Sequence, residues 1–186
     1  YMNWEFALLD FIYQHFYHPI SNALMVFITY LGEYGCIWIF LAILLLCKKK
    51  YRTYGILMLL SLLITFLIGE VGLKHIVGRV RPCDVQPFVS ILIPKPDGFS
   101  FPSGHTASSF TAAVILFHAN RKWGIGALIL AFLIAFSRIY LYVHYPTDIL
   151  AGMLLGIGVA TALYAIYRRI RKPMAPTVIS KEDSRW

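Results

Sequence analysis

The stretch GILMLLSLLITFLIGEVGL, at residues 55–73, decides the fold class, because its only charged side chain is that of Glu70. A helix of roughly 20 apolar residues is long enough to cross the hydrocarbon core of a bilayer. Comparable apolar stretches lie at residues 20–47, 103–120, 123–142 and 149–167. The sequence therefore predicts an all-α integral membrane bundle of about six transmembrane helices.

The composition supports this assignment and excludes other classes of protein. Of the 186 residues, 59% are hydrophobic and 14% are charged, whereas soluble domains carry about 25% charged residues. The net charge is +8, but the basic residues form short clusters between apolar stretches, so we expect no nucleic-acid partner. Three scattered cysteines are too few for a disulfide framework or a zinc site.

We expect residues 1–186 to form a single membrane-embedded domain. Residues 3–18 mix polar and aromatic side chains, which fits either an amphipathic helix at the membrane interface or the start of a further span. The Gly-Glu-Tyr-Gly sequence at 32–35 interrupts an apolar stretch, as either a kink in one long helix or a turn between two segments. Residues 173–186 are polar and predict a flexible cytoplasmic tail. No signal-peptide pattern follows Met2, so we expect no cleavable leader.

Positive charge near the ends of the spans predicts their orientation. The basic clusters lie at residues 48–52, 121–122 and 168–172. With the predicted spans between them, all three fall on one side, which the positive-inside rule assigns to the cytoplasm. The polar motifs lie at residues 74–82, 102–106 and 137–148, and all three fall on the opposite side. The sequence thus predicts one site at the outer face of a multi-pass protein of the cytoplasmic membrane.

The first motif supplies cations. Lys74 and Arg81 are seven residues apart, so on a continuous helix both would face one side, and Pro82 would then end the regular structure. A basic cluster could simply snorkel to the interface, but Lys and Arg are disfavoured on the outer side of a membrane. Glu70 lies one turn before Lys74, a spacing that predicts an ion pair that orients the lysine.

The second motif, Pro102-Ser103-Gly104-His105-Thr106, is typical of a helix start. Ser103 suits the N-cap, Gly104 permits close approach of the backbone, and free amides at a helix N-terminus bind anions. An ordinary capped helix does not explain His105, because the helix dipole disfavours a cation in the first turn. A bound anion would reverse that penalty.

The third motif combines Ser137-Arg138 with His144 and Asp148. Asp148 would lie near the N-terminus of the last span, and a hydrogen bond to His144 would leave the other imidazole nitrogen free to attack. His105, His144 and Asp148 could also hold a metal. Because the outer face has few carboxylates and several cations, we favour a site without metal or cofactor.

Together the three motifs resemble the type-2 phosphatidic acid phosphatase superfamily, whose pattern is K-x6-R-P, P-S-G-H and S-R-x5-H-x3-D. The resemblance rests on residues 74–148, which match each fixed position of the pattern. These are Lys74, Arg81, Pro82, Pro102, Ser103, Gly104, His105, Ser137, Arg138, His144 and Asp148. The short membrane-embedded form is similar to bacterial lipid phosphatases that act on phosphatidylglycerophosphate or undecaprenyl diphosphate.

The resemblance implies an α-helical bundle, a metal-independent mechanism and a role for each matched polar residue. His144 would attack phosphorus to form a phosphohistidine, Asp148 would orient His144, and His105 would protonate the leaving oxygen. The groups that would hold the phosphoryl oxygens are Lys74, Arg81, Ser103, the Gly104 amide and Arg138. Stabilising the charge on these oxygens is most of what a phosphoryl-transfer site must do.

Two other functions and several details stay open on the sequence alone. A phospholipid transporter or scramblase-like binder would use the cations but would not need the His144–Asp148 pair. A haloperoxidase would bind vanadate in the same pocket, but the membrane spans disfavour it. The apolar segment 83–101 either dips into the interface or packs against the bundle. Neither the preferred lipid nor the oligomeric state can be read from the sequence.

Overall fold

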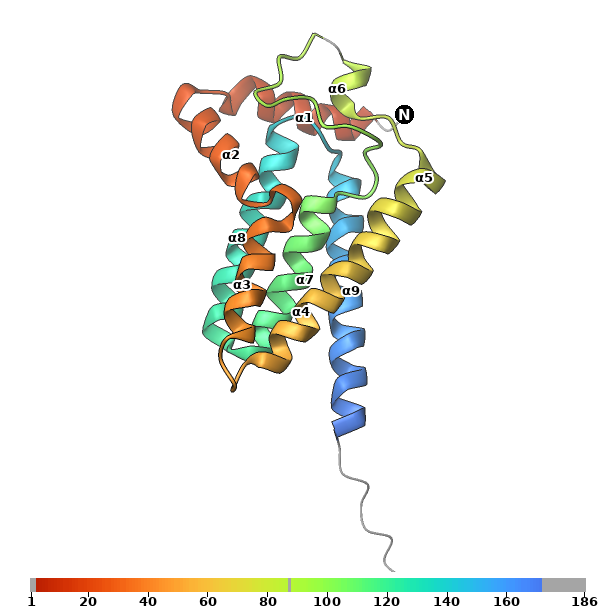
Figure 1. Cartoon of the computed structure of the whole chain (residues 1–186). Coiled ribbons are helices and arrows are strands. Elements are labelled where there is room, and N and C mark those ends of the chain that lie inside the picture. Colours follow the sequence, from red (N-terminus) through yellow and green to blue (C-terminus); the bar gives the residue numbers. More distant parts are fainter. Residues whose placement is uncertain (1–2, 87, 172–186) are drawn as a thin grey trace, which may run out of the picture.

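The computed structural model of the chain describes residues 3–86 and 88–171, and this part of the chain is helical without any strand. Figure 1 shows the elements in chain order. They are α1 (Asn3–Phe16), α2 (Pro19–Leu31), a 3₁₀ turn η1 (Glu33–Gly35), α3 (Cys36–Leu46), α4 (Arg52–Phe66), a π-helical stretch η2 (Leu67–Leu73), α5 (Lys74–Val77), α6 (Pro82–Val85), α7 (Gly104–Ala119), α8 (Arg121–Tyr140) and α9 (Pro146–Arg171). The predicted all-α class is confirmed.

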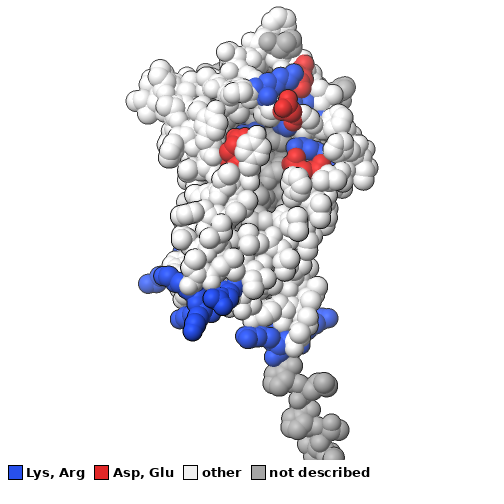
Figure 2. All heavy atoms as spheres, in the orientation of Figure 1, with Lys and Arg blue, Asp and Glu red and all other residues white. Residues whose placement is uncertain are grey.

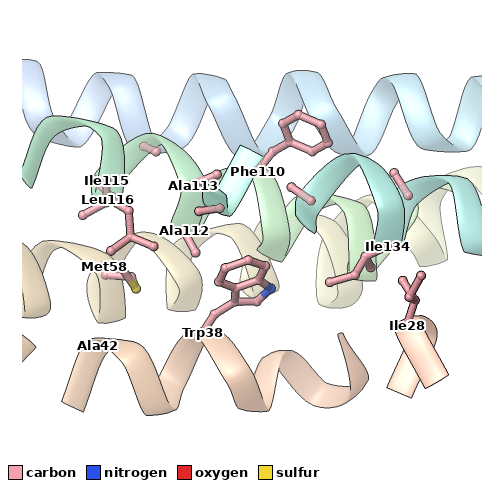
Figure 3. Close-up of a cluster of buried hydrophobic side chains, with 14 of the residues drawn as sticks. Ile28, Trp38, Ala42, Met58, Phe110, Ala112, Ala113, Ile115, Leu116 and Ile134 are labelled. Atoms are coloured by element: carbon pink, nitrogen blue, oxygen red, sulfur yellow. The ribbon is translucent and has the colours of Figure 1, made fainter. Parts of the chain in front are cut away.

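Helix α7 is the central element of the bundle, and it packs against α4, α8 and α9. Its sequence is rich in small residues, and most of its side chains are buried. Ala112, Ala113 and Ile115 pack into the hydrophobic cluster in Figure 3. A buried polar pair also joins α7 to α3, where Trp38 Nε1 donates to Ser109 Oγ at 3.0 Å. The small residues of α7, such as Ala112 and Ala113, allow close packing between helices in a membrane.

Three helical stretches of the described residues are long and apolar enough to cross a membrane: Arg52–Val85, Arg121–Tyr140 and Pro146–Arg171. A fourth candidate is the pair Pro19–Leu31 and Glu33–Leu46, which is bent by 42°. Helix α7 is shorter, at 16 residues, and lies among these spans. Helix α1 lies across one end of the bundle in Figure 1. Of the two alternatives for residues 3–18, this position favours the interfacial helix.

The break at residues 32–35 is a turn between two helices. Tyr34 and Gly35 both have left-handed backbone conformations, with φ of 48° and 66°. Such angles end a right-handed helix and suit glycine, and they are uncommon for tyrosine. The turn brings Glu33 to the cavity described below.

The expectation that Lys74 and Arg81 share one helix is wrong. The helix ends at Gly78, whose φ of 58° provides a left-handed C-cap, as glycine commonly does. Arg81 is extended, and Pro82 begins the short helix α6 instead of ending regular structure. The two cations therefore reach the site from separate segments.

The charged side chains divide between the two ends of the bundle. Figure 2 shows lysines and arginines alone at one end, and side chains of both signs near the other. The first end is formed by the α3–α4 loop, the α7–α8 junction and the end of α9 (Figure 1), which carry the basic clusters at residues 48–52, 121–122 and 168–171. The predicted flexible tail at 173–186 lies outside the described residues.

Candidate active site

A cavity of about 790 Å³ at the mixed-charge end of the bundle collects side chains from all three motifs. Its polar wall contains Lys74, Arg81, His105, Arg138 and His144. Its apolar wall is formed by α3 and α4, through Ile39, Leu59, Leu62, Leu63 and Phe66. Residues of all three motifs therefore line one cavity. This cavity has a cationic region next to an apolar region.

The start of α7 forms one side of the polar wall. Ser103 is the N-cap, and its Oγ accepts hydrogen bonds from Thr106 N at 3.5 Å and from Thr106 Oγ1 at 3.0 Å. The Ser103 amide donates to the backbone oxygen of Asp148 at 3.1 Å, which ties the start of α7 to the start of α9. A Cβ at Gly104 would lie 2.2 Å from Glu70 Oε1. A residue with a Cβ at this position would therefore have to displace the Glu70 carboxylate.

Lys74 lies beside this helix start. Its Nζ donates to Glu70 Oε2 at 2.5 Å, which is the ion pair that the spacing predicts. Glu70 belongs to the π-helical stretch η2, and such distortions are frequent at functional sites. Because the Glu70 carboxylate also packs against Gly104, the pair places the lysine charge next to the first turn of α7.

Arg81 is buried and ties three segments together. Its guanidinium donates to the carbonyl oxygens of Gly98 and Asp97 at 3.0 Å and to that of Val143 at 3.1 Å. The Arg81 Nη1 atom also lies 3.2 Å from His144 Nε2. These contacts fix the loop before α7 against the loop that carries His144.

His144 lies in the loop between α8 and α9 and is buried. Its Nδ1 lies 3.5 Å from both Asp148 Oδ2 and Ser100 Oγ, so its Nε2 faces the cavity beside Arg81. Burial lowers the pKa of His144 to about 3; the Asp148 carboxylate opposes this shift, and the nearby cations add to it. The imidazole is therefore neutral at physiological pH, and with Nδ1 protonated toward Asp148 its Nε2 carries a lone pair.

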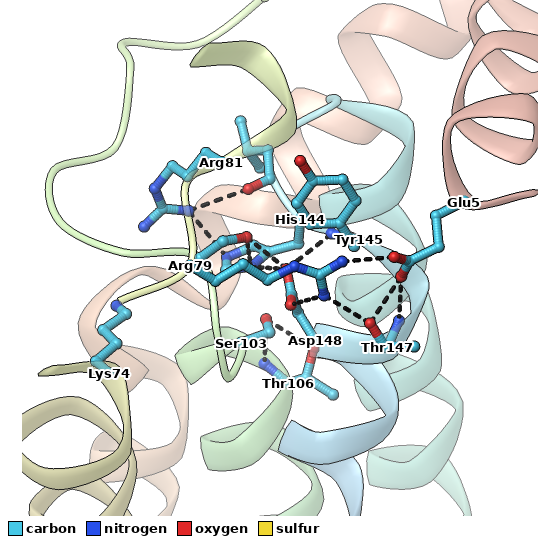
Figure 4. Close-up of polar contacts among 12 residues, drawn as sticks. Glu5, Lys74, Arg79, Arg81, Ser103, Thr106, His144, Tyr145, Thr147 and Asp148 are labelled. Carbon is cyan, nitrogen blue, oxygen red and sulfur yellow. Dashed lines mark hydrogen bonds and ion pairs between the residues drawn. The ribbon is translucent and has the colours of Figure 1, made fainter. Parts of the chain in front are cut away.

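Asp148 has more partners than the sequence analysis expected. Besides His144, its carboxylate accepts hydrogen bonds from Ser100 Oγ, from the Tyr145 amide at 2.8 Å and from Arg79 Nη1 at 2.8 Å. Arg79 in turn pairs with Glu5 of α1 (Figure 4). Arg79 and Ser100 lie close in sequence to the motifs. For Glu5, the sequence offers one indication of a role: it is a charged residue in a segment that is otherwise rich in aromatic side chains.

Arg138 and His105 complete the polar wall. Arg138 is buried and donates from Nη1 to Thr29 Oγ1 at 2.6 Å, while its Nε has no hydrogen-bond partner among the described residues. His105 Nε2 lies 3.8 Å from Glu33 Oε2 and likewise has no hydrogen-bond partner within that part of the chain. Buried polar atoms without partners are costly. Since Lys74 and Arg81 line the same part of the cavity, an anion is the ligand that would satisfy these atoms.

The described residues contain no group of three His, Cys, Asp or Glu side chains placed to hold a metal ion. The donors around the cavity are lysine, arginine and imidazole, together with the amides at the start of α7. Helix N-termini and guanidinium groups both favour phosphate oxygens. The arrangement can therefore bind a phosphoryl group next to a neutral imidazole.

Residues 50–172 match the family model of the PAP2 superfamily. The chain belongs to this superfamily, as the motifs predict. It is 41% identical to an undecaprenyl-diphosphatase of Sulfolobus acidocaldarius over 73% of this chain and 65% of that protein. It is 30% identical to the undecaprenyl-diphosphatase BcrC of Bacillus subtilis over 96% of this chain and 90% of that protein.

The fold is also that of a solved membrane phosphatase. The PAP2-type phosphatidylglycerolphosphate phosphatase of Bacillus subtilis superposes with a TM-score of 0.73 at 29% identity, covering 90% of this chain and 86% of that chain. Membrane-spanning helices and relatives of this kind identify a multi-pass membrane protein.

Proposed function

We propose that this chain is a metal-independent phosphatase that hydrolyses a lipid phosphate or diphosphate through a phosphohistidine intermediate. The observation that carries the proposal is the cavity in which the neutral imidazole of His144 faces Lys74, Arg81 and Arg138. The names of the relatives, undecaprenyl-diphosphatase and phosphatidylglycerolphosphate phosphatase, support the class of reaction.

In the first half of the reaction, the lone pair of His144 Nε2 attacks phosphorus and forms a P–N bond while the P–O bond to the lipid breaks. Asp148 accepts the Nδ1 proton in a hydrogen bond and stabilises the charge that develops on the ring. Burial and the surrounding cations lower the pKa of His105 in the empty site, and the charge of a bound phosphate raises it again. With substrate bound, the protonated His105 gives its proton to the leaving oxygen. The cations and the amide of Gly104 hold the other phosphoryl oxygens, where transition-state charge accumulates.

In the second half, water attacks the phosphohistidine on the face opened by the departed lipid. His105, now neutral, takes a proton from this water, and the P–N bond breaks to release inorganic phosphate. The imidazole of His144 returns to its neutral form and His105 returns to its protonated form. No metal ion is needed, because fixed cations neutralise the phosphoryl charge throughout.

The shape of the cavity supports a lipid as the substrate. Its cationic part adjoins a wall of α3 and α4, where Ile39, Leu63 and Phe66 are also exposed on the flank of the bundle. In a membrane, this flank contacts lipid tails. A substrate whose head group lies at the cations can keep its tail along this wall. Undecaprenyl diphosphate and phosphatidylglycerophosphate both have this form.

We also propose that the site faces the outside of the cytoplasmic membrane. The basic clusters gather at the end of the bundle opposite the cavity (Figure 2). Lys and Arg near the ends of spans favour the cytoplasmic side. The cavity then opens at the outer leaflet.

The test is phosphate release by the purified protein from three lipids: undecaprenyl diphosphate, phosphatidylglycerophosphate and phosphatidic acid. We expect turnover of at least one of them in excess EDTA, and none by His144→Ala. Activity that disappears in EDTA and returns with magnesium would contradict the metal-independent mechanism. Binding of all three lipids without phosphate release would identify a non-catalytic lipid binder.

A further inference from the structure

An ion-pair network outside the cavity links the N-terminal helix to Asp148. Arg79 Nη1 donates to Asp148 Oδ1 at 2.8 Å and to Thr147 Oγ1 at 2.6 Å, while its Nη2 donates to Glu5 Oε2 at 2.5 Å. The Arg79 guanidinium also lies over the ring of Tyr145, 3.8 Å from its centroid. One planar group thus holds two carboxylates and an aromatic ring in a fixed arrangement (Figure 4).

Glu5 acts on the start of α9 as well as on Arg79. Its Oε1 accepts hydrogen bonds from Thr147 Oγ1 at 2.7 Å and from the Thr147 amide at 3.3 Å. Amides in the first turn of a helix lack partners within the helix, and a carboxylate there is favoured by the dipole. Glu5 therefore caps, from another helix, the turn that carries Asp148.

The burial of these groups shows that the network is more than a surface contact. Glu5 is 2% exposed and Asp148 is fully buried, although both are carboxylates. Buried charge is expensive, and replacing a buried ion pair by apolar residues is often neutral or stabilising. Packing of α1 alone would therefore not require Glu5. The effect that does require the Glu5–Arg79 ion pair is the fixed position of the Asp148 carboxylate.

We propose that Glu5 and Arg79 are positioning residues of the proposed phosphatase reaction: they fix the carboxylate of Asp148, and through it the imidazole of His144. With Oδ1 held by Arg79, the Oδ2 atom is left for Ser100, the Tyr145 amide and His144. Helix α1 is thereby part of the active site, although it lies outside the spans. This inference rests on the proposed function.

The position of Arg79 predicts a specific kinetic signature. Lys74, Arg81 and Arg138 line the cavity, whereas Arg79, Glu5 and Asp148 do not. A group that never touches substrate should affect the rate of the chemical step more than substrate binding. We expect Arg79→Ala to lower kcat by about 10- to 100-fold with little change in KM, because a small misplacement of a reacting group is costly. Lys74→Ala, the matched cavity cation, should also raise KM.

The decisive readout is chemical rescue. Arg79 is 26% exposed, so a small guanidinium ion can reach the space left by Arg79→Ala. Added methylguanidinium should raise the kcat of Arg79→Ala several-fold, and it should leave the kcat of His144→Ala unchanged. A merely structural role would give no such recovery in protein that is already folded. Thermal unfolding in detergent checks the fold of each variant.

A second variant keeps the test informative if Arg79→Ala does not fold. Glu5→Gln retains the shape of the side chain and removes its charge, and we expect it to lower kcat with KM unchanged. Where both variants fold, the double variant should lose no more kcat than Arg79→Ala alone, because both act through Asp148. Losses that simply multiply, an unchanged kcat, or an effect on KM alone would overturn the positioning role.

The wild type and His144→Ala separate this inference from the proposed function. If the wild type releases no phosphate from any of the three lipids, the proposed function fails, and the positioning role fails with it. If the wild type is active and His144→Ala is not, an unimpaired Glu5→Gln or Arg79→Ala overturns the positioning role alone.

Discussion

Gly152 of α9 faces the backbone oxygen of Ser103, and a Cβ at Gly152 would lie 2.6 Å from that oxygen. The missing side chain lets the start of α9, with Asp148, pack directly against the start of α7. Gly152→Ala should therefore separate the two helix starts, with a loss of about 1–3 kcal/mol of stability and reduced turnover. Thermal unfolding and phosphate release in detergent measure both effects.

Gly158 provides the matched control for this prediction. It lies on the same helix, and a Cβ there would meet nothing within 4 Å. Gly158→Ala should leave turnover intact and should not lower stability, because alanine in a helix is about 0.5–1 kcal/mol more favourable than glycine. Equal losses in the two variants would mean that glycine content of α9, rather than its contact with Ser103, governs stability.

His144→Ala should lower kcat by at least about a thousandfold, because it removes the proposed nucleophile. His75→Ala is the control, since His75 is exposed and follows Lys74 directly in the sequence. It should retain wild-type turnover. Circular dichroism and size-exclusion chromatography confirm that both variants fold. More than a few per cent of residual activity in His144→Ala would exclude this residue as the nucleophile.

The lowered pKa of His144 predicts the protonation state of this residue in the substrate-free protein. A folded-state pKa of about 3 lies below the ordinary value of about 6.5, so the ring binds its extra proton only at strongly acidic pH. Nitrogen NMR of histidine-labelled, ligand-free protein should show a neutral His144 ring from about pH 7.5 down to about pH 5. The signal is assigned by its absence in His144→Ala. A titration midpoint near pH 6.5 would contradict the assigned environment.

Cysteine accessibility in intact cells tests the orientation. In a background without Cys36, Cys47 and Cys83, a cysteine in place of Lys95, which is exposed at the cavity end, should react with a membrane-impermeant maleimide. A cysteine in place of Lys122 should react only after the cells are permeabilised. The reverse pattern would refute the outward-facing site.

The sequence predicted the helical class, the family, the helix start at Ser103 and the place of Asp148 near the start of the last helix, because these depend on local composition and spacing. It also predicted the gathering of the motifs at one end of the bundle, since spans of known length alternate between two sides of a membrane. The motif residues therefore share a cavity. Their catalytic roles stay proposals that the variants above test.

The sequence did not predict the shell around Asp148. Glu5 lies 74 positions from Arg79, and Ser100 lies 48 positions from Asp148. The local periodicity of the sequence does not specify which polar groups, distant in sequence, come into contact when α1 packs on the bundle. The shared-helix prediction for Lys74 and Arg81 failed for a local reason, because the left-handed turn at Gly78 ends the helix between them.

The apolar wall of α3 and α4 has a kinetic consequence. A substrate that reaches the cations while its tail stays along this wall never enters bulk water, so its encounter with the enzyme is a two-dimensional search. The governing variable is then the mole fraction of substrate in the membrane or micelle, and its total concentration has no separate effect. Adding inert detergent at a fixed amount of substrate would slow the enzyme by surface dilution alone.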